Sequence, residues 1–168
     1  MKKILILAAD NFEDSELLYP YYRLQEAGGD VKVAGLGEAQ YSGKHGVPVK
    51  CDGRIEDFDP ADFDVLVIPG GWAPDKLRQS KVVLDLVRSA HDGKKLIASI
   101  CHGPQVLISA GILKGRKVTC AAAIKDDVIN AGAEYSDEPV AVDNNLITSR
   151  KPADLPAFCR EVVKRLEG

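Results

Sequence analysis

The sequence predicts an α/β fold in which a mostly parallel sheet is covered by helices on both faces. Three observations support this class. Strand-like apolar runs alternate with segments of helical periodicity, the connections between them are short, and the runs at 3–9 and 64–68 are apolar enough for strands buried on both faces. No linker or repeat interrupts the pattern, so residues 1–168 are expected to form a single domain.

The first half of the chain shows the alternation most clearly. A strand at 3–9 precedes a helix at 14–27, which has apolar residues on one face and ends at Gly28-Gly29. A second strand follows at 31–36. Residues 41–51 alternate around a Lys-His-Gly turn and predict a small hairpin inserted into the main pattern.

The second half continues the same scheme. The elements expected there are strands at 64–68, 95–100 and 117–120, helices at 76–91, 103–113 and 124–131, a strand pair within 140–149, and a terminal helix at 153–166. Ligands of such sheets bind beyond the carboxyl ends of the strands. The segments 10–13, 70–75 and 101–104 occupy that position and are the candidate site segments.

Composition excludes several classes of function. The net charge is −3 and no Lys/Arg-rich run is present, so neither a nucleic-acid partner nor a membrane-surface partner is expected. The apolar runs are far shorter than the roughly 20 residues of a membrane span, and we expect a cytoplasmic protein. Four cysteines without CxxC spacing predict reduced thiols, with no metal site and no cofactor.

The segment Ala98-Ser99-Ile100-Cys101-His102-Gly103-Pro104 contains the strongest chemical signal. It runs from a strand through a cysteine into a helix start, the pattern of a nucleophile elbow. The adjacent helix N-terminus favours the thiolate and predicts a lowered pKa for Cys101. The alternative is that Cys101 is a small buried apolar residue, as free cysteines commonly are.

Two further features surround this turn. Gly70 and Gly71 lack Cβ atoms, so their N–H groups could approach a developing oxyanion, with the His102 N–H as a second donor. Glu13 follows the first strand and could reach the sulfur as a proton donor, although an acid there could equally do no more than favour a helix N-terminus. His102 could likewise have only a structural role, because adjacent residues need not face one another.

The chain resembles the PfpI intracellular cysteine peptidase family of the ThiJ/PfpI superfamily, which is related to class I glutamine amidotransferases. The resemblance covers essentially the whole chain. The matching segments are Asp10-Asn11-Phe12-Glu13-Asp14, Gly43-Lys44-His45-Gly46, Pro69-Gly70-Gly71, Ser99-Ile100-Cys101-His102-Gly103-Pro104, Lys125-Asp126-Asp127, Asn130-Ala131-Gly132 and Ser149-Arg150 with Pro152.

The resemblance implies a flavodoxin-like fold and self-association, from a dimer up to a hexamer. It implies that Cys101 is the nucleophile, that Glu13 contacts its sulfur, and that His102 is the base. It also implies that Asp75 completes a triad across a subunit interface. One departure is Ala121-Ala122, where several relatives carry a Tyr-Pro pair near the site, so the pocket here should be more open.

The first hypothesis for function is therefore a cysteine-dependent hydrolase of the peptidase type, acting on a peptide or a small carbonyl compound. Glyoxalase activity, which converts methylglyoxal to lactate, or protein deglycase activity would use the same residues. A different class of hypothesis is a non-enzymatic oxidation sensor or holdase chaperone, in which Cys101 is oxidised to a sulfinic acid.

Overall fold

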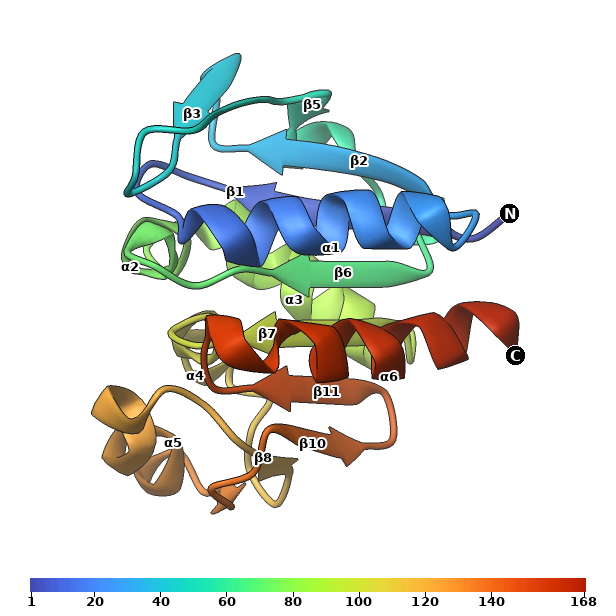
Figure 1. The fold of residues 1–168 in the computed structure, drawn as a ribbon. Helices are drawn as coiled ribbons and strands as arrows, with labels where there is room; N and C mark the ends of the chain where they lie inside the picture. The colour runs from blue at the N-terminus through green and yellow to red at the C-terminus, as the bar shows by residue number, and fades with distance from the viewer.

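The computed structural model describes residues 1–168 and confirms the single-domain α/β class, with a seven-stranded sheet covered on both faces (Figure 1). The strand order is β10-β11-β7-β6-β1-β2-β5. Its strands are β1 (Lys3–Ala8), β2 (Asp30–Gly35), β5 (Gly53–Arg54), β6 (Val65–Ile68), β7 (Leu96–Ile100), β10 (Val140–Asp143) and β11 (Leu146–Ser149). All neighbours are parallel except β10 and β11.

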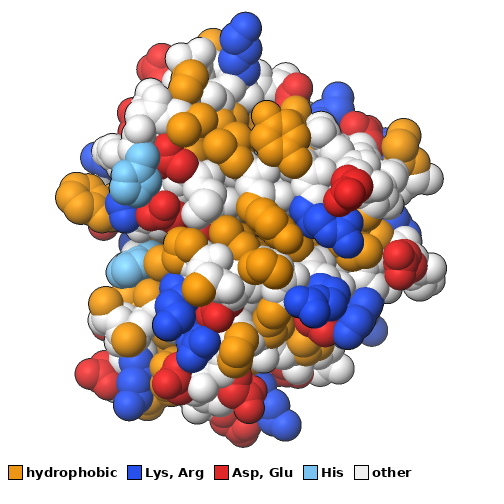
Figure 2. All heavy atoms as spheres, in the orientation of Figure 1, with side chains coloured by type: hydrophobic (Ala, Val, Ile, Leu, Met, Phe, Trp, Pro, Cys, Tyr) orange, Lys and Arg blue, Asp and Glu red, His pale blue; other side chains and the backbone are white.

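Helices pack on both faces of this sheet. In Figure 1, α1 (Asp14–Glu26) and α6 (Leu155–Glu167) lie in front, and α3 (Lys81–Asp92) and α4 (Pro104–Ala110) lie behind. The short helices α2 (Ala73–Leu77) and α5 (Lys125–Asn130) lie at the edge where the parallel strands end. Both signs of charge are interspersed with apolar side chains on the front face (Figure 2).

The core lies on both sides of the central strands. Every residue of β6 and β7 is buried, and so is all of β1 after Lys3. This burial explains why these strands read as continuous apolar runs rather than as alternating ones. Phe12 and Phe158 are the largest side chains that are fully buried.

Two smaller sheets complete the structure. The predicted hairpin is present as β3 (Gln40–Ser42) paired antiparallel with β4 (Pro48–Lys50). The strand expected at 117–120 is the two-residue β8 (Lys117–Val118), which pairs with β9 (Glu134–Tyr135) in parallel.

Two predicted helices differ from the structure. The helix expected at 76–91 is divided into α2 and α3, because Ser80 adopts an extended backbone and its hydroxyl accepts a hydrogen bond from the Val83 N–H. The helix expected at 103–113 ends at Ala110, because Gly111 is left-handed with φ 75° and terminates it. No helix of the structure has the length and apolar character needed to span a membrane.

The strand order places the candidate segments together. The chain runs outward from β1 to β2 on one side of the sheet and from β6 to β7 on the other, so the order reverses between β1 and β6. Ligands bind at such switch points, beyond the carboxyl ends of the strands. The segments that follow β1, β6 and β7 meet at this edge.

Candidate active site

Cys101 lies in a strained turn directly after β7. Its φ is 63°, a left-handed conformation that non-glycine residues seldom adopt. The backbone is held on both sides, because the Cys101 N–H donates to the Ser149 carbonyl at 3.0 Å and its carbonyl accepts from the Ala121 N–H at 3.0 Å. The predicted elbow is therefore present, with the side chain projecting at the edge of the sheet.

Glycines around the turn are required by close contacts. A Cβ at Gly103 would lie 2.6 Å from the Ile68 carbonyl oxygen and 2.9 Å from that of Ile100. A Cβ at Gly70 would lie 2.5 Å from Glu16 Oε2 and 2.7 Å from the Cys101 Cβ. The second pair of contacts also shows that the Glu16 carboxyl and the cysteine flank the same glycine.

The Cys101 sulfur has one imidazole and two amide neighbours. His102 Nδ1 lies 3.2 Å from Sγ, and it accepts the thiol proton when the ring proton is on Nε2. Burial, followed by the charge of Lys44, lowers the pKa of His102, so its ring is neutral near pH 7. The backbone N–H groups of Gly71 and His102 are near enough to the sulfur to favour its thiolate and to lower its pKa.

The carboxyl group that interacts with the thiol belongs to Glu16, in the first turn of α1. Its side chain is fully buried next to the Cys101 thiol, which influences its pKa, and its Oε2 accepts the Gly70 N–H at 2.7 Å. Oε1 is buried without a partner of good hydrogen-bond geometry. Burial raises the pKa of Glu16 to about 8, so this carboxyl is protonated near neutral pH and can donate a proton.

The predicted lowering of the thiol pKa is wrong for this chain. Burial, followed by the Glu16 carboxylate, raises the pKa of Cys101 to about 12, and the two amide donors oppose this only in part. Glu16 therefore loses its proton near pH 8, well before the thiol does. Below that pH both groups are protonated, so Cys101 would need a base to become a thiolate.

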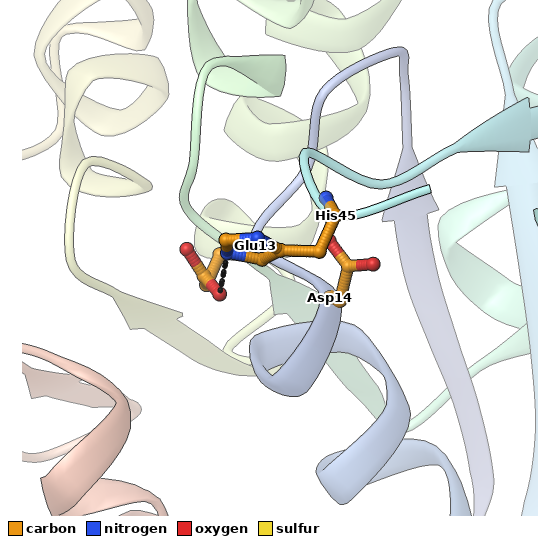
Figure 3. A group of neighbouring side chains, drawn as sticks. All are labelled: Glu13, Asp14 and His45. Atoms are coloured by element: carbon orange, nitrogen blue, oxygen red, sulfur yellow. Dashed lines mark hydrogen bonds and ion pairs between the residues drawn. The ribbon is translucent and has the colours of Figure 1, made fainter. Parts of the chain in front are cut away.

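Glu13 does not occupy the expected place beside the sulfur. Its Oε2 accepts a hydrogen bond from Lys44 Nζ at 3.0 Å, and its Oε1 lies 3.6 Å from His45 Nε2 (Figure 3). Glu13 immediately precedes α1, so its side chain leaves the helix toward the hairpin loop. Glu16, three residues later, points from the helix toward Gly70.

The two glycines expected in the oxyanion site have different roles. The Gly70 N–H is already bonded to Glu16, so it is not free to stabilise an oxyanion. The Gly71 N–H lies near the sulfur, so its role toward an oxyanion stays a prediction, and the residue needs its flexibility because its φ is 77°. A Cβ at Gly71 would also lie 2.6 Å from the Asn11 carbonyl oxygen.

Asp75 and the remaining cysteines form no hydrogen bond with the residues around the Cys101 sulfur. Asp75 is exposed on α2 and forms no ion pair within the chain, so a contact to His102 from another subunit stays a prediction. Trp72, at the start of α2, is 69% exposed. Cys120 and Cys159 are buried, Cys51 is half-buried, and all four cysteines are free thiols.

Ligand atoms of Glu13, Asp14 and His45 lie within 4.8 Å of one another, the spacing of a metal site (Figure 3). Their oxygens already have partners in the protein. The two Asp14 oxygens accept the backbone N–H groups of His45 and Val47 at 3.0 and 3.1 Å, and Glu13 pairs with Lys44. The group therefore holds the hairpin loop against α1.

Comparisons with known proteins show what the whole chain is similar to. A relative from Pyrococcus furiosus, named deglycase PfpI, is 49% identical over 98% of this chain and 99% of its own length. YraA of Bacillus subtilis, whose name marks it as a candidate cysteine protease, is 45% identical over 99% of each chain.

A solved structure from Anabaena variabilis joins a DJ-1/ThiJ/PfpI-like domain to a ferritin-like domain. It superposes with a TM-score of 0.97 at 43% identity over 99% of this chain, which spans 48% of that longer one. The sequence model of the DJ-1/PfpI family matches residues 2–165. The chain therefore belongs to the DJ-1/PfpI family.

Proposed function

We propose that this protein is a cysteine-dependent hydrolase of small reactive carbonyl compounds and of the adducts that they form with amines. One observation carries the proposal: a buried carboxyl that is protonated at neutral pH and a neutral imidazole both contact the Cys101 sulfur. Such a site supplies a nucleophile, an acid and a base within one small volume. The name of the Pyrococcus furiosus relative supports the same chemistry.

The first step is attack of the Cys101 sulfur on an aldehyde carbon. The C–S bond forms as the π electrons of the carbonyl move to oxygen, and the thiol proton passes to His102 Nδ1. Neutral Glu16 donates its proton to that oxygen, which gives a hemithioacetal. With a hemiaminal adduct, the C–S bond forms as the C–N bond breaks, the thiol proton passes to His102 Nδ1, and neutral Glu16 protonates the leaving amine, which gives the same hemithioacetal.

The second step converts the hemithioacetal of a dicarbonyl such as methylglyoxal into a thioester. The Glu16 carboxylate removes the proton from the sulfur-bearing carbon and returns it to the neighbouring carbon. His102 exchanges protons with the two oxygens during this isomerisation. Water then hydrolyses the lactoyl thioester, which releases lactate and restores the thiol without any change in overall oxidation state.

The thiol's burial favours small substrates over folded polypeptides. Cys101 is only partly exposed, and Gly70, Gly71, Glu16 and His102 surround its sulfur. A small carbonyl carbon can approach the sulfur along the remaining open direction. Peptide hydrolysis is the second candidate, supported by the name of YraA, and it would use the same sulfur and the Gly71 and His102 N–H groups.

Parallel assays test the proposal. Lactate formation from methylglyoxal, release of amine from a methylglyoxal-treated amino acid, and release of a fluorophore from peptides are measured for wild type and for Cys101→Ala. Cys51→Ala is the matched control, since Cys51 is also half-buried but packs against Gly35 at the end of β2 and has no influence on the pKa of Cys101. We expect lactate and amine release to vanish only in Cys101→Ala; Cys101-dependent peptide cleavage without lactate formation would select the second candidate instead.

We also propose that an adjoining subunit brings Asp75 to His102. The exposure of Asp75 and its lack of an ion pair within the chain support this arrangement. Cys101→Ala and Asp75→Asn proteins, each inactive alone, should regain partial activity after subunit exchange, because some interfaces then combine both intact residues. Full activity of Asp75→Asn, or inactive mixtures despite verified hetero-oligomers, would refute the shared site.

A further inference from the structure

A basic cavity lies at the end of the sheet opposite Cys101. It has a volume of about 650 Å³ and lies where β6 and β7 begin, beside the turn between β10 and β11 and the end of α6. β7 separates it from the nucleophile, and its five residues span roughly 17 Å. The cavity is therefore independent of the site described above.

Five cationic side chains line this cavity: Lys2, Lys94, Lys95, Lys164 and Arg165. They come from three separate parts of the chain, so no basic run in the sequence reveals them. The whole chain has 22 Lys and Arg residues against 25 Asp and Glu residues, so such a gathering is not a consequence of composition. In Figure 2 several Lys and Arg side chains lie on the side where Figure 1 places the two chain ends.

These cations are poorly neutralised by the protein. Only Lys164 forms an ion pair, with Glu161 at 2.6 Å, while the other four form none within 4.0 Å. Asp64 is the single acidic side chain in the lining, and its Oδ2 already accepts the Lys3 backbone N–H at 2.9 Å. The surplus of positive charge thus remains available to an anion.

The lining also defines what kind of anion would fit. Only two hydrophobic residues, Val65 and Leu96, line the cavity, and no aromatic ring is present on which a nucleotide base could stack. The amides of Asn144 and Asn145 already donate to Asp143 and to the Lys95 carbonyl. Charge is the main means of recognition, and lysines bind phosphate groups as point charges. The volume lies within the range of small-molecule sites.

We propose that this cavity binds a compact polyphosphate anion, with several phosphate groups spread over the unpaired cations. The phosphates would bridge Lys94 and Lys95, which precede β7, and Arg165 at the end of α6. Binding would require neither Cys101 nor any other residue of the catalytic site.

Titration calorimetry of the full chain with tripolyphosphate tests this proposal at low and moderate salt. The site variant is Lys94→Gln/Arg165→Gln, in which both replaced side chains are exposed and unpaired. The control, Lys50→Gln/Lys114→Gln, makes the same change in net charge at exposed positions outside the cavity. Circular dichroism spectra confirm that both variants remain folded.

We expect saturable binding by wild type and by Cys101→Ala. Affinity should fall at least tenfold in the site variant and less than twofold in the control. It should also weaken as salt increases, because exposed charges are screened. Equal weakening in both variants would show general surface attraction and overturn the proposal, as would no binding at millimolar tripolyphosphate. Binding of ATP more than tenfold tighter than that of tripolyphosphate would overturn the inference that no base is recognised.

Discussion

Glu16→Gln should stabilise the protein increasingly as the pH rises. Burial raises the pKa of Glu16 from 4.5 to about 8, so between these values the folded state binds more protons at this residue than the unfolded state does. The contribution of Glu16 to stability is therefore fully present below pH 4.5 and is lost as the pH rises through 8. Glutamine resembles the protonated acid in shape, and its carbonyl can still accept the Gly70 N–H.

The size of this effect follows from the pKa shift. A shift of roughly 3.5 units corresponds to about 5 kcal/mol at full ionisation, and to roughly 3 kcal/mol at pH 7. We therefore expect the difference in unfolding free energy between Glu16→Gln and wild type to grow by about 3–5 kcal/mol between pH 4 and pH 9.

Urea denaturation at one protein concentration, repeated across this pH range, measures the difference. Glu13→Gln is the control, because Glu13 is paired with Lys44 at the edge of the site and is not fully buried. Its stability should follow that of wild type within about 1 kcal/mol, the worth of an exposed ion pair. Parallel stability curves for Glu16→Gln and wild type would refute the assignment of Glu16 as a buried acid.

Three further predictions concern neighbouring residues. Gly103→Ala should destabilise the fold by roughly 1–3 kcal/mol in urea denaturation, since its Cβ would meet the Ile68 carbonyl oxygen at 2.6 Å; an unchanged midpoint would contradict this contact. Burial and the charge of Lys44 both lower the pKa of His102. Lys44→Met removes only the charge, so an NMR titration should show a higher pKa for His102 than in wild type. An unchanged titration would disprove this electrostatic coupling. His102→Gln should reduce lactate formation by about 10²–10⁴-fold at saturating methylglyoxal, the usual contribution of a general base, and wild-type turnover would exclude it from that role.

The sequence predicted the turn that holds Cys101 because local rules determine it. Small residues around Cys101 and Pro104 at the helix start indicate a strand–turn–helix junction, and the parallel alternation places that junction at the carboxyl edge of the sheet. The two-residue strands β5 and β9 were not predicted, since so short a segment has no periodicity to detect.

The acid partner was assigned to the wrong residue because the choice depends on side-chain direction along α1. Glu13 and Glu16 are both near the start of this helix, and only Glu16 points to Gly70. One signal in the sequence could have identified it. Glu16 lies on the same helical face as Leu17, Pro20 and Leu24, all of which are buried, and a charged residue on an apolar face is a candidate functional group.

The pKa of the thiol could not be predicted from the helix terminus, because the result depends on burial. Desolvation of Cys101 by the surrounding fold, together with the charge of Glu16, outweighs the amide donors of Gly71 and His102. The distances and burial that decide this balance exist only once β1, β6 and β7 have assembled.

The pH dependence of Cys101 alkylation by iodoacetamide tests most directly whether Glu16 is coupled to the thiol. Mass mapping gives the rate at Cys101 separately from the other three cysteines, and no substrate is needed. Glu16→Gln should shift the midpoint of the profile to lower pH by at least about one unit, because the ionised carboxylate no longer repels the thiolate. Glu13→Gln should leave the midpoint in place. An unmoved profile in Glu16→Gln, or the larger shift in Glu13→Gln, would contradict the pairing of Cys101 with Glu16.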